Sequence, residues 1–130
     1  MKITAIDHLV LTVADIARTV AFYSDVLGMT AQSFTVVDGS MRTALFFGTQ
    51  KINLHLVKTP FAPHAGSPMT GTADLCLLTD NTMGEWIDHI AKLNIEILEG
   101  PVARTGAQGP ITSIYIRDPD QNLIEISTYD

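Results

Sequence analysis

Residues 6–29 read IDHLVLTVADIARTVAFYSDVLGM, and this stretch decides how the chain begins to fold. Its first eight residues alternate, with leucines and valine on one side, which predicts a strand with one buried face. Asp15 then offers an N-cap, and apolar residues recur at helical spacing as far as Leu27. Gly28 suits the left-handed conformation that often ends a helix. The stretch predicts a strand followed by a helix.

Three further strands are expected after this helix, at 30–37, 42–47 and 52–57, so the first half has the order βαβββ. A Pro- and Gly-rich connector without periodicity follows. The second half repeats the order. It has a strand at 72–79, a helix opened by the capping box of Thr82 and Glu85, and strands at 95–98, 111–117 and 123–128.

The predicted fold class is therefore α+β, with two βαβββ modules forming a curled mixed sheet around a metal-binding cup. We expect one domain over residues 1–130, divided into module one (1–58), a connector (59–71) and module two (72–130).

When the two halves of the sequence are aligned, polar residues fall at matching positions. An offset of 66 places His8 on Asp74, and an offset of 70 places His55 on Glu125. Strand alternation puts all four on the face opposite the aliphatic residues. Two ionisable side chains thus recur at matching points of the first strand of each half, and two more at matching points of the last.

Imidazole nitrogens and carboxylate oxygens together suit a divalent transition metal, namely Zn, Ni, Mn, Co or Fe. We expect His8, His55, Glu125 and Asp74 as metal ligands, with Asp74 either a ligand or the proton carrier. Asn53 lies on the same face as His55 and could replace it, because the register of that strand is open by two residues. A pocket without metal is the alternative.

One more residue is a candidate for the site. Residues 100–110 are rich in Gly and Pro and are expected to form a loop that could fold over the cup. Within it, Arg104 is a candidate clamp for a substrate carboxylate. A plain hairpin loop with a solvated Arg104 is the other interpretation.

Three stretches of the chain resemble the vicinal oxygen chelate superfamily, which includes glyoxalase I, fosfomycin-resistance thiol transferases and extradiol dioxygenases. They are DHLVL at 7–11, FYSDVLGM at 22–29, and RDPD with NLIE between 117 and 125. Within the superfamily, QKINLH at 50–55 and ADLC at 73–76 resemble the subgroup called glyoxalase domain-containing protein 5.

The resemblance implies a metal at the cup, with His8 and Glu125 in the first-strand and last-strand ligand positions. Asp74 stands where metal-binding members usually have His, and Asn53 most closely matches a position where glyoxalase I often has Glu. Gln121 replaces the Gly that usually follows Asp-Pro-Asp. Short relatives are usually homodimers, so a homodimer is expected.

The function expected from these residues is a metal-dependent lyase or isomerase of the lactoylglutathione lyase type. The metal would polarise two neighbouring substrate oxygens, as in a hemithioacetal, while a site carboxylate, Glu125 or Asp74, moves a proton. Two alternatives remain: a non-haem iron dioxygenase of a catechol-like substrate, and a metal-free protein that binds a small molecule.

The overall composition narrows the partners. Eight basic against fourteen acidic residues give a net charge of −6, which disfavours nucleic acids and anionic membrane surfaces. The single cysteine, Cys76, fits a reducing compartment, and no long apolar run or leader is apparent. A cytoplasmic protein acting on a small molecule is expected.

Overall fold

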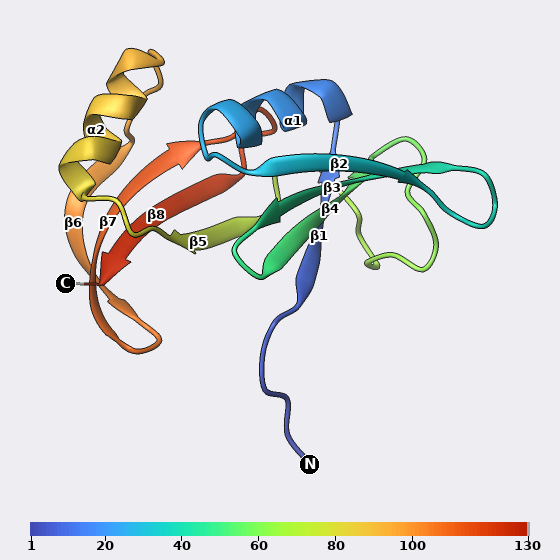
Figure 1. Ribbon diagram of the computed structural model, residues 1–130, viewed down its shortest axis with the longest axis horizontal. Helices are drawn as coiled ribbons and strands as arrows, with labels where there is room; N and C mark the ends of the chain where they lie inside the picture. Colours follow the sequence, from blue (N-terminus) through green and yellow to red (C-terminus); the bar gives the residue numbers. More distant parts are fainter. Residues whose placement is uncertain (130) are drawn as a thin grey trace. The chain divides into compact units, whose positions relative to one another are not determined.

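The computed structural model describes residues 1–129, which fall into two compact units, Met1–Gly71 and a second unit that begins at Thr72. Each unit contains a strand, a helix and three more strands in that order (Figure 1). The repeated βαβββ order confirms the predicted α+β class. No helix within residues 1–129 is both long and apolar enough to cross a membrane.

The first unit is a four-stranded sheet with one helix packed on it. Its elements are β1 (His8–Val13), α1 (Ile16–Asp25), β2 (Thr30–Thr35), β3 (Met41–Phe47) and β4 (Gln50–Leu56). The strands lie in the order β1-β4-β3-β2, and β1 runs parallel to β4 while the other neighbours are antiparallel. The first and last strands of the module are therefore adjacent.

The second unit has the same topology. Its elements are β5 (Asp74–Leu78), α2 (Met83–Lys92), β6 (Glu99–Gly106), β7 (Gly109–Arg117) and β8 (Leu123–Tyr129). The strand order is β5-β8-β7-β6, with β5 parallel to β8. The first and last strands of this module are again adjacent.

The helices begin and end where local sequence signals predict. The Asp15 side chain accepts a 2.8 Å hydrogen bond from the backbone of Arg18 at the start of α1. Thr82 and Glu85 form the predicted capping box at the start of α2. Gly28 and Asn94 adopt φ values of 70° and 54° just beyond the helix ends, as expected for left-handed terminators.

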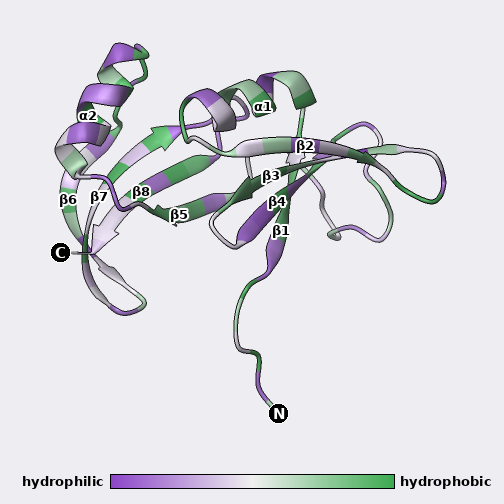
Figure 2. Cartoon of the chain, viewed as in Figure 1, coloured by the Kyte–Doolittle hydropathy of each residue, from purple (hydrophilic) through white to green (hydrophobic). Residues whose placement is uncertain are grey.

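Each sheet buries one face. Aliphatic side chains alternate along the strands with polar ones, and Figure 2 shows this as bands along β8. The most buried members are Leu11, Val13, Leu45, Ile52 and Leu54 in the first unit and Ile114, Ile116, Ile124 and Ile126 in the second. Each contributes about 1.5–3 kcal/mol by leaving water. The opposite face of each sheet is called its open face below.

The sixth strand differs from the prediction. Residues 95–98 form no strand, and most of the expected 100–110 loop instead belongs to β6 and its turn into β7. Gly and Pro at 100–101 gave the loop signal, but β6 is an edge strand and its register shifts between Glu99 and Val102. Such an irregularity at an edge accommodates a Pro that cannot donate to the ladder. Arg104 therefore lies on a strand.

Candidate metal and substrate site

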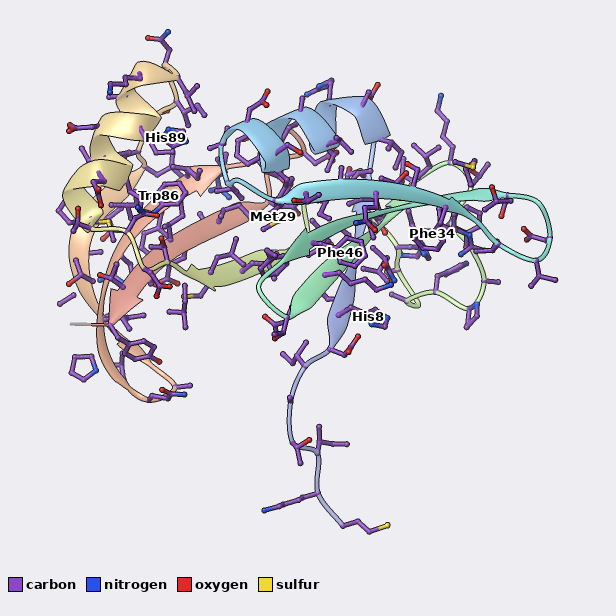
Figure 3. All side chains as sticks on the ribbon, viewed as in Figure 1. His8, Met29, Phe34, Phe46, Trp86 and His89 are labelled. Atoms are coloured by element: carbon purple, nitrogen blue, oxygen red, sulfur yellow. The ribbon has the colours of Figure 1, made fainter. Side chains whose placement is uncertain are left out.

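His8 lies at the start of β1, on the open face of the first unit (Figure 3). Its Nδ1 donates a 2.7 Å hydrogen bond to the Asp7 carboxylate, and its side chain is 44% exposed. A neutral imidazole that donates from Nδ1 carries its lone pair on Nε2. The Asp7 contact therefore orients His8 as partner carboxylates orient metal-binding histidines.

The register of β1 and β4 decides which residues accompany His8. The open-face pairs are His8 with Lys51, Val10 with Asn53 and Thr12 with His55. Asn53 is one step along the face from His8, whereas His55 is two steps away, about 13 Å along the strand. Metal–ligand bonds of about 2 Å favour the side-chain oxygen of Asn53 over the more distant His55 as the second donor of this unit.

The second unit repeats this arrangement with carboxylates. Asp74 pairs with Leu123, and Glu125 is one step further along the same open face. Asp74 and Glu125 thus hold the same relation as His8 and Asn53. The sequence match of His55 with Glu125 at an offset of 70 was wrong by two residues, because the paired strands correspond at an offset of 72.

Glu125 is half-buried between two neighbours. Cys76 lies opposite it on β5 and Tyr115 opposite it on β7. Its Oε1 accepts a long 3.4 Å hydrogen bond from Ser127. Burial, and then the hydrogen bond to Glu125 and its negative charge, raises the pKa of Tyr115 against the opposing hydrogen bond from Arg104. The carboxylate of Glu125 is thus set among hydroxyl groups that orient it.

Asn122 fixes the strands that carry these two carboxylates. Its side chain accepts a 2.9 Å hydrogen bond from the backbone of Ala73, the residue before Asp74. Its amide nitrogen donates to the Asp118 carboxylate at 2.8 Å, and both side chains are buried. Asn122 was not predicted as important, although the NLIE stretch that begins with it carries part of the family resemblance.

Arg104 lines a pocket of about 410 Å³ together with Glu125, Tyr115 and Cys76. Its Nε donates to the Tyr115 hydroxyl at 3.0 Å, and another nitrogen donates to Glu99 at 2.9 Å. Arg104 is therefore neither loosely solvated nor free of partners. A substrate carboxylate that binds there must compete with Glu99.

The comparisons with known proteins can be set against this geometry. The pattern of the glyoxalase/bleomycin resistance protein/dioxygenase superfamily matches residues 5–126. The chain belongs to this superfamily.

Several superfamily members are close in sequence. Virulence protein STM3117 of Salmonella typhimurium is 54% identical over 99% of this chain and 87% of its own. Its crystal structure covers all of both chains with a TM-score of 0.92 and 52% identity. The glyoxalase domain-containing protein RDO1 of Mycosarcoma maydis is 46% identical over 99% of this chain and 70% of its own. The metallothiol transferase FosB of Staphylococcus epidermidis is 28% identical over 97% and 84%.

Superfamily members include metal-dependent enzymes, so the fit of a metal is judged here from the donors. Asn53 has a buried side-chain oxygen without a hydrogen-bond partner, which is unusual and suits a metal ligand. The orientation of His8 and the carboxylates of Asp74 and Glu125 fit the same class of ion. Among residues 1–129, no three His, Cys, Asp or Glu side chains cluster as metal ligands, so no unit supplies a complete set from these types.

Sequence reasoning missed one charged residue on the open face of the first unit. Arg42 lies on β3, where continuation of the register places it opposite His55. Its guanidinium lies 3.2 Å from the centroid of the Phe61 ring, whose edge-to-face contact with His55 spans 5.3 Å. Burial, followed by the charges of Arg42 and His64, lowers the pKa of His55. Alternation along 42–47 could have placed Arg42 on the open face, but only the pairing of β3 with β4 places it opposite His55.

Proposed function

We propose that this protein is a metal-dependent lyase or isomerase of the glyoxalase type, acting on a small substrate with two neighbouring oxygens, such as a hemithioacetal. The observation that supports this most is the repeated donor pair. His8 with Asn53, and Asp74 with Glu125, occupy equivalent steps on equivalent strands. Chance placement of four donors at four matching positions is a weaker explanation than a common role in metal binding.

The ligands that we propose for a Zn, Ni, Mn, Co or Fe ion are His8, Glu125 and Asn53, with Asp74 as the proton carrier. His55 was expected from sequence as a ligand, but it lies two steps along the open face from His8 and is not included in the proposed set. The ion would act as a Lewis acid on two substrate oxygens. We also propose that the protein belongs with the subgroup called glyoxalase domain-containing protein 5, that it forms a homodimer and that it is cytoplasmic.

The two carboxylates have different surroundings and so different tasks. Asp74 is exposed, and a carboxylate in contact with solvent can take a proton from a substrate carbon and return it to the neighbouring carbon. Glu125 is half-buried and held beside Ser127 and Tyr115, which suits a ligand of fixed orientation. The isomerisation consumes no other reactant, because the proton removed from one carbon is returned to the other.

Metal content tests the first part of the proposal. Purified protein reloaded with one ion type is expected to hold about one ion per chain, and both His8→Ala and Glu125→Ala are expected to lose it. Arg18→Gln, on α1, is a matched surface control that should keep the ion. Wild-type protein that holds no ion at near-stoichiometric level would contradict the proposal and favour a metal-free binding protein.

A second assay separates the isomerase from the dioxygenase. The loaded protein should convert a hemithioacetal to its thioester without consuming oxygen, and Asp74→Asn should reduce the turnover at least tenfold while the ion is retained. Oxygen uptake with Fe²⁺ and a catechol, in the absence of hemithioacetal turnover, would instead identify the dioxygenase.

A further inference from the structure

Buried polar atoms without partners gather on the open face of the first unit. Within residues 1–129, the buried side-chain nitrogen and oxygen atoms that lack a hydrogen bond are Nε of Arg42, Oδ1 of Asn53 and Nδ1 of His55. All three come from β3 and β4, and most buried polar groups in folded proteins are paired. A bound group that satisfies them is the simplest reason for their position.

The three atoms divide into two kinds. The amide oxygen of Asn53 is an acceptor, and the metal proposed above accounts for it. Arg42 Nε is always a donor, and His55 Nδ1 can donate in the matching tautomer. His55 is only 8% exposed, so its unpaired nitrogen is a costly arrangement in a protein without a ligand.

Within residues 1–129, Arg42 forms no ion pair with a carboxylate. The ion pairs of His8 with Asp7 and of Arg104 with Glu99 do not involve it. Hydrogen bonds from Ser40, and last of all the charge of Arg42, lower the pKa of the exposed Asp38. Arg42 is therefore attracted to Asp38 without an ion pair to it, and its positive charge lies beside an unpaired imidazole.

Aromatic side chains fix these donors in place and set the character of the surroundings. Phe61 contacts both the guanidinium of Arg42 and the ring of His55. Phe34 lies opposite Arg42 on β2, and Figure 3 shows it on the same unit as Phe46. A ligand that reaches this place meets two donors at the edge of an apolar surface.

We propose that Arg42 and His55 form a subsite for an oxyanion group, carboxylate or phosphate-like, carried by a substrate with an apolar body. Arg42 Nε and His55 Nδ1 donate to the oxyanion, and Phe61 holds both side chains in position. The subsite extends the proposed function, since it names a group that the substrate must carry. It does not require the metal, and so it can be tested without one.

The test is a titration of the full chain in chelator, at constant ionic strength, with benzoate, phenylphosphonate and neutral benzyl alcohol. Binding is followed by NMR of the arginine Nε–H and histidine ring signals. We expect saturable shifts of the Arg42 and His55 signals with at least one of the two anions, and none with benzyl alcohol. Which anion binds tells whether the substrate group is a carboxylate or is phosphate-like.

Variants then assign the effect to the named donors. Arg42→Gln should weaken anion binding about tenfold or more, as expected for loss of a charged hydrogen bond. Arg42→Lys keeps the charge but loses the Nε–H and the flat contact with Phe61, and should recover only part of the affinity. Arg18→Gln, on the helix side of the same sheet, should bind as wild type does.

Two results would overturn the subsite. One is the absence of saturable anion binding to wild-type protein, and the other is equal binding by wild type and by an Arg42→Lys or Arg42→Gln variant with an unchanged melting temperature. Failure here with a normal metal content would leave the metal proposal standing. Saturable anion binding here, together with wild-type protein that holds no ion after reloading, would support the oxyanion subsite while refuting the metal proposal.

Discussion

Two rows of side chains, one in each unit, occupy equivalent positions and have opposite properties. The first-module outer row consists of Thr12, His55, Arg42 and Phe34, and the second-module outer row consists of Leu78, Ser127, Ser113 and Val102. In the second, the serine hydroxyls bond to each other at 2.7 Å and are fully buried. In the first, the donor atoms Arg42 Nε and His55 Nδ1 have no partner.

The comparison shows that the repeated backbone determines where the side chains point. The residue types then determine whether a row stabilises the sheet or is available to bind a ligand. A satisfied pair such as Ser113 and Ser127 stabilises the sheet. An unsatisfied pair such as Arg42 and His55 costs stability and is retained where a ligand completes it. The four predictions below test this contrast, from the largest expected effect to the smallest.

A methyl group added at Gly100, next to Ser113 of the second-module outer row, should destabilise the fold. A Cβ added at Gly100 would lie 2.5 Å from the Ser113 carbonyl oxygen, and Gly100 has φ of 113°. We expect Gly100→Ala to lower the free energy of unfolding by about 3 kcal/mol in urea denaturation. Gly84→Ala, in α2 with open space around it, should raise it by about 0.5–1 kcal/mol. Equal effects of the two changes would mean that β6 and β7 are not closely paired there.

Metal binding can decide whether Asn53, as the strand register indicates, or His55, as the sequence match indicated, is the counterpart of Glu125. If Asn53 rather than His55 corresponds to Glu125, Asn53→Ala should weaken metal affinity about tenfold or more, while His55→Ala should leave it within about twofold. Competition with a coloured chelator measures both. The reverse order of effects would restore His55 as the ligand and refute the offset of 72.

Removal of a polar group should have opposite signs in the two outer rows. Ser113→Ala leaves the buried Ser127 hydroxyl with one partner fewer and should cost about 1 kcal/mol of unfolding free energy. His55→Leu removes a buried nitrogen that has no bond in the absence of ligand, and should be neutral or stabilising by about 1 kcal/mol. Thermal melts in chelator compare them. A clear loss of stability in His55→Leu would show that His55 is a structural residue.

The smallest effect concerns pH. Because burial lowers the pKa of His55, the unfolded chain binds a proton at this residue more readily than the folded chain. Stability should therefore fall as the pH drops below about 6.5, the ordinary histidine value, toward the lower folded-state pKa. His55→Leu should show a shallower fall over this window than wild type does. Identical slopes would mean that His55 does not titrate differently on folding.

Local signals in the sequence predicted much of this fold. The N-cap Asp15, the capping box of Thr82 and Glu85, and the terminators Gly28 and Asn94 each act within a few residues, so their effects can be inferred from the sequence. The placement of His8 and Asp74 at equivalent strand positions was also inferred, because both strands precede any variable loop.

Features that depend on pairing between distant strands were harder to predict from the sequence. The match of His55 with Glu125 failed because the hairpins of the two modules differ in length, and only the pairing of β4 and β8 with their parallel neighbours fixes the register. The edge strand β6 was missed because its Gly and Pro lie at an irregularity. Arg42 was overlooked because one charged residue in a strand gives no sign of what it faces.

The parallel pairs also suggest an order of events during folding. His8 pairs with Lys51, and Asp74 with Leu123, across long stretches of chain, whereas the β2–β3 and β7–β8 hairpins close over short ones. Closing a long loop costs more chain entropy and is slower. The strands that carry the proposed metal donors should thus come together last in each module. Refolding intermediates would have formed hairpins before the proposed donors could bind an ion.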